Sequence, residues 1–228
     1  MHSSVQENLA TVKQKLRDYE IRYHRPINSV SLLAVTKHQP IEKITAAIEA
    51  NQFEFGENYL QEALPKIEYF ADKNIIWHFI GPIQSNKTKK IAECFSWVHT
   101  VSDSKIAQRL NDQRPADLPE LNICIQVNVS EEDTKSGINL SEIENLAKFC
   151  ITLPRLKLRG LMTIPAPTDN LASARAELHK LQIAYGSLIK KGFPLDTLSM
   201  GMTDDMEAAV AEKSTIVRIG TAIFGARI

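Results

Sequence analysis

Apolar runs alternate with amphipathic segments along almost the whole chain. Eight runs have the length and apolar content of buried β-strands. These predicted strands span residues 30–37, 53–58, 75–81, 97–103, 122–130, 156–164, 197–203 and 216–225. Helical periodicity predicts an opening helix over residues 3–24 and further helices over residues 40–51, 140–150 and 171–192. The last helix begins near Asp169 and Asn170 and ends at Gly192, which is the residue chemistry expected of helix caps.

The alternation of strands with helices predicts the fold. It favours an α/β protein in which helices cover a parallel sheet, and eight is the number of strands that closes a barrel. The chain ends soon after the eighth strand, so the opening helix would fill the outer position that is otherwise empty. A doubly wound open sheet is the alternative, but no GxGxxG turn follows any predicted strand. We therefore predict one domain over residues 1–228, a TIM-type (β/α)8 barrel preceded by an N-terminal helix.

The composition and charge narrow the classes of partner. Of the 228 residues, 43% are hydrophobic and 24% are charged, and 27 basic side chains balance 27 acidic ones. This balance argues against nucleic acid or a membrane surface as a partner. The three cysteines (Cys94, Cys124 and Cys150) are odd in number and lack CxxC spacing, and the N-terminus has no apolar leader. We therefore predict a cytoplasmic protein with reduced thiols, and we expect a monomer.

One lysine stands where a strand places core side chains. Because side chains alternate along a strand, Lys37 points to the same side as Leu33 and Val35. Active sites of barrels gather at the C-terminal ends of the strands, and Lys37 ends the first one. The alternative is a lysine that extends its ammonium group into solvent. The other residues at this predicted rim are Glu57, Asn58, His78, Ser199, Gly201, Arg218, Gly220 and Thr221.

The rim residues suggest a site for an aldehyde that carries an anion. Burial of a lysine disfavours the ammonium form, and the free amine attacks aldehydes and ketones to form a Schiff base. Many barrels bind phosphate at the loops after strands seven and eight. There, Gly201 and Gly220 allow close backbone approach, and Ser199 and Thr221 offer hydroxyl groups. The next helix is expected to open near Thr203 and to add its N-terminal amides. Ordinary packing is the alternative for the glycines.

Arg218 needs an acceptor inside the predicted barrel. It lies two residues before Gly220 and therefore on the same face of the last strand. A buried guanidinium is costly unless something accepts its hydrogen bonds. The acceptor is either a ring nitrogen of a bound heteroaromatic compound or an inward carboxylate such as Glu57. These residues alone leave both open.

Eight motifs carry a resemblance to a known family, namely LLAVTK, FGENYLQEA, WHFIGPIQSNK, HTVSD, KSGI, GLMTI, LSMGMTDDMEAA and VRIGTAIFG. With them the chain resembles the pyridoxal phosphate homeostasis proteins, whose fold is similar to the N-terminal barrel of alanine racemase. The resemblance covers nearly the whole chain and implies pyridoxal 5'-phosphate as cofactor. It implies that Lys37 forms an aldimine with the cofactor and that Arg218 faces the pyridine nitrogen. The remaining cofactor-binding residues would be Ser199, Gly201, Gly220 and Thr221 at the phosphate and Asn58, His78 and Met162 around the ring.

Three functions fit a lysine that forms a Schiff base at this rim. The first is intracellular homeostasis and carriage of pyridoxal phosphate, which would pass to apo-enzymes that depend on it, without substantial turnover. The second is an amino-acid racemase, and the third is an aldolase that uses Lys37 without cofactor. Racemisation usually needs two acid–base groups, and the family resemblance implies that alanine racemase takes its second one, a tyrosine, from another domain. The chain ends at Ile228 and leaves no residues for such a domain, so we predict the carrier.

Two further signals are weaker. His78 and His99 have no His, Asp or Glu neighbours at metal-ligand spacing, so we predict no metal site. Lys135 lies in the loop after the fifth strand, at the same rim. It is either a solvated loop lysine or a second acceptor for the aldehyde, and the sequence leaves the two open.

Overall fold

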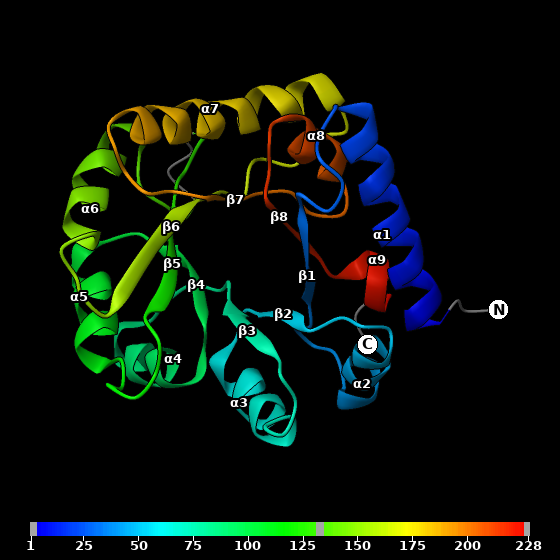
Figure 1. Ribbon diagram of the computed structural model, residues 1–228, viewed down its shortest axis with the longest axis horizontal. Coiled ribbons are helices and arrows are strands. Elements are labelled where there is room, and N and C mark those ends of the chain that lie inside the picture. Colours follow the sequence, from blue (N-terminus) through cyan, green and yellow to red (C-terminus); the bar gives the residue numbers. More distant parts are fainter. Residues whose placement is uncertain (1–3, 131–134, 226–228) are drawn as a thin grey trace.

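Eight short parallel strands close into a barrel in the computed structural model, which describes residues 4–130 and 135–225 (Figure 1). Each strand pairs with the next along the chain, and β1 pairs with β8. The strands are β1 (Ser31–Val35), β2 (Glu54–Glu57), β3 (Ile76–Phe79), β4 (Trp97–Val101), β5 (Leu121–Gln126), β6 (Leu156–Met162), β7 (Thr197–Ser199) and β8 (Ile216–Ile219). The α-helices are α1 (Val5–Arg22), α2 (Ile41–Glu49), α3 (Leu60–Tyr69), α4 (Thr88–Cys94), α5 (Ser104–Gln113), α6 (Ile143–Cys150), α7 (Leu171–Lys190), α8 (Met206–Ala211) and α9 (Thr221–Phe224), and the 3-10 turns are η1 (Ser85–Lys87) and η2 (Leu140–Glu142). The predicted (β/α)8 barrel with an N-terminal helix is confirmed.

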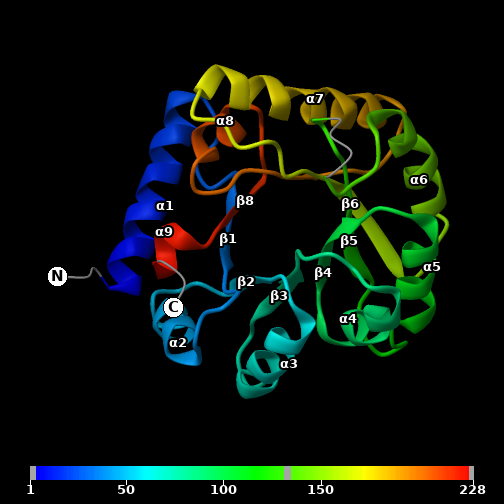
Figure 2. The same ribbon diagram turned by 180° about the vertical axis from the view of Figure 1, so that it is seen from behind.

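Helix α1 takes an outer position on the barrel. Its start is fixed by a capping box, in which the Glu7 N–H donates to Ser4 Oγ at 3.2 Å and the Ser4 N–H donates to Glu7 Oε2 at 2.8 Å. Its buried face includes Leu9, Val12 and Leu16. The helix contacts α2, α8 and α9, and Figures 1 and 2 show it running beside them along the outside of the barrel. The opening helix thus fills the outer position of the barrel that the sequence predicted for it.

The two faces of β1 show how the barrel divides its side chains. Leu32 and Ala34 belong to the large apolar cluster that the strands share with the helices. Leu33 and Val35 belong to a separate small cluster with Ile80 and Ile216. Because side chains alternate along a strand, this second cluster faces the barrel interior. None of the helices within the described residues is long and apolar enough to cross a membrane.

Several strands end earlier than predicted. β1 ends at Val35, so Lys37 lies two residues beyond it rather than at its last position. β7 ends at Ser199, and the following Gly201 has a left-handed backbone with φ +100° that cannot continue a strand. β8 ends at Ile219, and Thr221 begins α9 instead of extending the strand. The apolar runs continue past these points because the turns are also packed against the barrel.

The structure agrees with the predicted ends of one helix and differs from the predicted start of another. The long helix α7 begins after Asn170, whose Oδ1 accepts hydrogen bonds from the N–H groups of Ala172 and Ser173. It ends before Gly192, which has a φ of +88°, so the predicted caps are confirmed. The helix after β7 was expected to begin near Thr203, but α8 begins at Met206. The Met202 N–H donates to Asp205 Oδ1 at 2.6 Å, and this contact holds the intervening residues as a turn.

Candidate functional site

A cavity of about 280 Å³ opens at the C-terminal ends of the strands. Its volume lies just below the range of about 300–1,000 Å³ that is typical of small-molecule sites. Residues from the ends of β1, β2, β3, β6, β7 and β8 converge on it. The lining residues are Val35, Lys37, Asn58, Ile80, Ile164, Met202, Thr203, Asp204, Arg218, Gly220 and Thr221. We call this cavity the rim pocket.

The rim pocket collects five of the nine predicted site residues, which are Lys37, Asn58, Arg218, Gly220 and Thr221. Four others lie outside its wall. Met162 and Ser199 are fully buried at the ends of β6 and β7, and His78 is 1% exposed on β3. Gly201 packs against α8, since a Cβ at that position would lie 2.4 Å from the Cβ of Ala209. These four residues therefore do not line the rim pocket, and their contact with a cofactor stays a prediction.

A buried ion pair anchors the segment that presents Lys37. Lys66 of α3 donates to Glu57 Oε1 at 2.7 Å and to the Thr36 carbonyl oxygen at 2.8 Å. The Thr36 hydroxyl donates to the same Glu57 oxygen at 2.6 Å. Burial raises the pKa of Glu57, while Lys66 and Thr36 oppose that rise. Glu57 therefore pairs with Lys66 and is not the acceptor for Arg218.

Arg218 is a buried cation held by uncharged acceptors. Its Nη1 donates to Ser199 Oγ and its Nη2 to the Thr163 carbonyl oxygen, each at 2.8 Å. Burial lowers the pKa of Arg218 to about 10, so the guanidinium is still charged at neutral pH. It forms no ion pair within residues 4–130 and 135–225. A guanidinium with donors to spare at a pocket wall is suited to an acceptor on a ligand.

The start of α9 and the turn after β7 add hydrogen-bonding groups to the rim pocket. Gly220 and Thr221 open the short helix α9, and the first amides of a helix have no acceptor inside it. Met202 and Thr203 come from the turn after β7. Sequence reasoning did not select these two as site residues, because it expected a helix to begin there. The clue was the position of Thr203, just beyond the end of a barrel strand.

Asn58 contributes an unsatisfied acceptor. Its Oδ1 is buried and has no hydrogen-bond partner among the described residues. Buried polar atoms are nearly always paired, so an orphaned acceptor at a pocket wall indicates a group that a ligand or water would satisfy. Ile80 and Ile164 add apolar surface to the same cavity. The pocket therefore combines an amine, a guanidinium, an amide and apolar side chains, which suits a polar heteroaromatic compound.

His78 and His99 lie deeper, inside the barrel. His78 Nδ1 is 2.9 Å from His99 Nε2, and His99 Nδ1 is 2.7 Å from Ser199 Oγ. Trp97 stacks on His78, with ring centroids 5.3 Å apart and planes at 9°. No group of three or more His, Cys, Asp or Glu in the described parts of the chain could hold a metal ion. His78 does not line the rim pocket, so its predicted place beside the cofactor ring stays a prediction.

Comparisons with known proteins agree with this architecture. The profile of the family described as "Alanine racemase, N-terminal domain" matches residues 3–228. A relative from Pasteurella multocida is 52% identical over 98% of this chain and 98% of its own length. A relative from Escherichia coli (strain K12) is 49% identical over 99% of this chain and 97% of its own length. Both are named "Pyridoxal phosphate homeostasis protein".

Solved structures show the same fold with different degrees of sequence similarity. PipY of Synechococcus elongatus, with pyridoxal phosphate bound, is 31% identical and superimposes with a TM-score of 0.81 over 97% of this chain and 100% of its own. Alanine racemase from Corynebacterium glutamicum is 15% identical, with a TM-score of 0.71 over 97% of this chain and 61% of its own, which is a likeness of fold alone. The chain therefore belongs to the alanine racemase N-terminal domain family and, within it, to the pyridoxal phosphate homeostasis proteins.

Proposed function

We propose that this protein binds pyridoxal phosphate in the rim pocket and keeps it available in the cell, without substantial turnover of a substrate. The observation that carries the proposal is the convergence of Lys37, Arg218 and the unsatisfied Asn58 Oδ1 on one cavity. PipY, 31% identical, is described with this cofactor bound, which supports the choice of ligand. The names of the Pasteurella and Escherichia relatives support the homeostatic role.

Different residues of the pocket would contact different parts of the cofactor. The Lys37 amine would condense with the cofactor aldehyde, which forms a carbon–nitrogen double bond and releases one water molecule. Arg218 would donate to the pyridine nitrogen, and Asn58 Oδ1 would accept a hydrogen bond at the ring. Gly220, Thr221 and Thr203 would hold the phosphate through amides and hydroxyl groups. Ser199, predicted at the phosphate, fits better as a support of Arg218, because its hydroxyl already accepts from that guanidinium.

Arg218 also argues for limited chemistry on the cofactor. When bound, pyridoxal phosphate supplies an electrophilic carbon and a ring that withdraws electrons. A guanidinium that donates to the pyridine nitrogen disfavours protonation of that nitrogen, because two positive charges would then face each other. An unprotonated ring is a weaker electron sink. Arg218 therefore restrains reactions that need a stabilised carbanion.

The acid–base groups at the pocket also favour binding over turnover. Among the described residues, the ionisable side chains that line it are Lys37, Asp204 and Arg218. Racemisation needs a second acid–base group positioned opposite the lysine. Tyr59 lies next to Asn58, but it is 46% exposed and outside the pocket lining. No tyrosine within the described residues lines the pocket, so the racemase alternative lacks its usual second group.

An open rim favours transfer of the cofactor to apo-enzymes that depend on it. Met202, Thr203, Asp204 and Thr221 line the pocket and are all exposed. A cofactor held there would be reachable by water and by an acceptor lysine of another protein. Imine exchange between two lysines needs no oxidant, because the second amine takes the aldehyde carbon as the first amine leaves. Lys135, next to the undescribed residues 131–134, stays a candidate acceptor within this chain.

Absorption spectroscopy and peptide mapping test the proposal. The protein loaded with pyridoxal phosphate should absorb visible light, and borohydride reduction should fix the cofactor on Lys37. Lys37→Ala should remove both signals and keep the fold, because this side chain lies at a turn and outside the apolar core. Lys89→Ala, at a lysine with a 71% exposed side chain, is the matched control, and Lys135→Ala tests the second acceptor. An unchanged adduct in Lys37→Ala would refute the site. Efficient turnover of free amino acids that Lys37→Ala abolishes would instead establish a racemase.

A further inference from the structure

A column of hydrogen-bonded side chains runs through the barrel interior beneath Arg218. Arg218 Nη1 donates to Ser199 Oγ at 2.8 Å, Ser199 Oγ is 2.7 Å from His99 Nδ1, and His99 Nε2 is 2.9 Å from His78 Nδ1. These four residues come from β8, β7, β4 and β3, and none is more than 4% exposed. A series of contacting side chains thus links four strands across the barrel interior.

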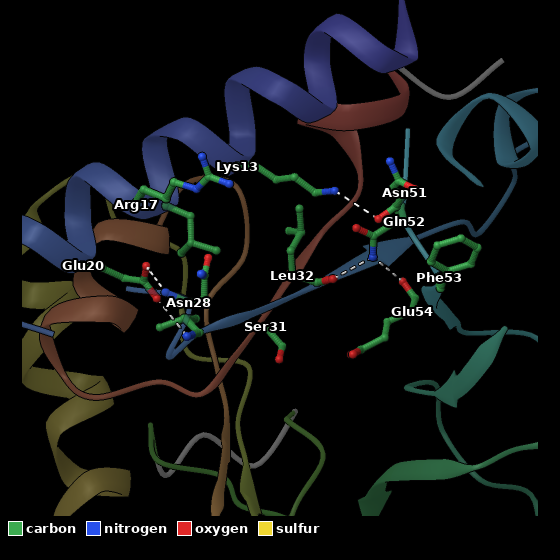
Figure 3. Close-up of a pocket in the computed structure, with 12 residues that line it drawn as sticks. Lys13, Arg17, Glu20, Asn28, Ser31, Leu32, Asn51, Gln52, Phe53 and Glu54 are labelled. Carbon is green, nitrogen blue, oxygen red and sulfur yellow. Dashed lines mark hydrogen bonds between the residues drawn. The ribbon is translucent and has the colours of Figure 1, made fainter. Parts of the chain in front are cut away.

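The column ends at Glu54, at the other end of the barrel. Glu54 Oε2 is 3.8 Å from His78 Nε2, and that nitrogen has no hydrogen-bond partner among the described residues. This separation is too long for a direct hydrogen bond, but one water molecule or a small rotation of the carboxylate would close it. Glu54 lines a second pocket of about 380 Å³ beneath α1, which has room for water (Figure 3). Figure 3 shows its carboxylate extending away from Gln52, which is held by the carbonyl oxygens of Leu32 and Glu54.

The groups at the two ends of the column favour one direction for its hydrogen bonds. A guanidinium can only donate, so Ser199 Oγ accepts from Arg218, and the hydroxyl hydrogen of Ser199 is then available to His99 Nδ1. Burial lowers the pKa of His78 to about 3 and the pKa of His99 well below its ordinary value, so both rings are neutral. His99 then donates from Nε2 to His78 Nδ1, and His78 carries its hydrogen on Nε2, towards Glu54. The reverse direction would turn the Nε2 lone pair of His78 towards the carboxylate.

We propose that Glu54, His78 and His99 are positioning residues for Arg218, which they hold in place through Ser199, with Glu54 as the acceptor at the far end of the column. In this direction the hydrogen bonds from Arg218 through Ser199 and His99 to His78 all run the same way, so each one strengthens the next. Arg218 forms no ion pair within the described residues, and the charge of Asp205 raises its pKa against the effect of burial, whereas Glu54 is the carboxylate that the column itself reaches. The link to the cofactor ring rests on the proposed function, whereas the column itself does not.

NMR of the protein without cofactor tests the column. With histidine labelled by nitrogen-15, His78 and His99 should both carry hydrogen on Nε2 and not on Nδ1 at neutral pH. Glu54→Gln removes the terminal charge at nearly constant shape and should shift the guanidinium resonances of Arg218. Glu54→Asp keeps the charge and should largely restore them. Asp196→Asn is the matched control, because Asp196 pairs with Arg159, whose guanidinium lies over the Trp97 ring, and has no contact with the column in the described residues.

The cofactor-loaded protein extends the test to the proposed function. Glu54→Gln should shift the visible absorption band and weaken pyridoxal phosphate binding roughly fivefold, whereas Asp196→Asn should change neither. Hydrogen on Nδ1 of either ring, or Arg218 resonances that respond equally to both variants, would overturn the column. Correct tautomers in a protein that does not bind pyridoxal phosphate would instead overturn the proposed function and leave the column standing.

Discussion

At the scale of single residues, the hydroxyl groups of Ser199 and Thr221 lie in different environments, although the sequence predicts both at one phosphate site. Ser199 is fully buried and bonded to Arg218 and His99. Thr221 is exposed at the rim pocket. A buried hydroxyl with two partners is already satisfied, whereas an exposed one at a helix start is available to an anion. The proposed phosphate site therefore uses Thr221 and its neighbours rather than Ser199.

Removal of each hydroxyl group should therefore weaken ligand binding in a different way. Thr221→Val should weaken binding of pyridoxal phosphate about tenfold or more, because hydrogen bonds to charged groups contribute roughly 1.5–3 kcal/mol. The same change should leave the affinity for pyridoxal, which lacks the phosphate, nearly constant. Ser199→Ala should instead weaken both ligands by similar factors, through Arg218. Titrations of both ligands by absorbance measure the effect, and a loss specific to the phosphate in Ser199→Ala would reverse the assignment.

The residue types at the site could be predicted from the sequence, but their depth could not. Lys37, Arg218, Gly220 and Thr221 follow barrel strands, and topology alone brings such positions to one rim. His78 and Ser199 also lie near strand ends, yet they are buried and do not line the pocket. A difference of one layer in a barrel depends on strand stagger, and the sequence carries no direct signal of stagger.

At the scale of elements, the turn after β1 is held by α3. Besides the contacts of Lys66 with Glu57 and Thr36, the His38 N–H donates to Glu62 Oε2 at 2.9 Å. His38 has a φ of +57°, an unfavourable backbone for a residue with a Cβ, so the turn needs these anchors. The position of Lys37 thus depends on a helix that follows the next strand.

Loss of the buried lysine should therefore be costly. Lys66→Met should lower the free energy of unfolding by about 3–5 kcal/mol, because it leaves the Glu57 carboxylate buried without its cation. Glu57→Gln combined with Lys66→Met should recover part of this loss. Lys89→Met, in an exposed pair with Glu93, should change stability by less than about 1 kcal/mol. Urea denaturation measures all three, and equal effects of Lys66→Met and Lys89→Met would contradict the anchor.

The order of the elements was predictable, whereas their ends were less so. Eight apolar runs predicted the barrel because each strand is covered on both faces. The runs 197–203 and 216–225 continue through turns, and the strands stop at Ser199 and Ile219. Met200 after β7 and Ile223 and Phe224 in α9 are buried like strand residues, so hydrophobicity does not separate them from the strands.

At the scale of the whole molecule, the barrel interior connects its two ends through polar side chains. His78 and His99 are 21 positions apart in the sequence and meet because β3 and β4 are neighbours. Taken singly, each reads as a packed histidine, and only the closed barrel with its register shows that they form a pair. The barrel interior therefore contains buried, hydrogen-bonded polar side chains as well as apolar ones, and two of them are titratable histidines.

The two buried histidines predict that the protein loses stability in mild acid. Their pKa values in the folded protein lie far below the ordinary value of about 6.5 that holds in an unfolded chain. Below pH 6.5 the unfolded chain binds two protons that the folded protein excludes, so stability is fully present above that pH and is lost as the pH falls. Each histidine contributes a slope of about 1.4 kcal/mol per pH unit once the pH is well below 6.5.

Between pH 7 and pH 5.5 the free energy of unfolding should therefore fall by roughly 2–3 kcal/mol. Burial raises the pKa of Glu54 and of Glu57, and these carboxyl groups act in the opposite direction, which restricts the clean window to mildly acidic pH. His99→Asn should reduce the slope by about half, because one of the two excluded protons is gone. His24→Gln, at an exposed histidine of the chain, should leave it unchanged. Urea titrations at the two pH values measure the slope, and equal stability at both would mean that the interior histidines accept protons without unfolding.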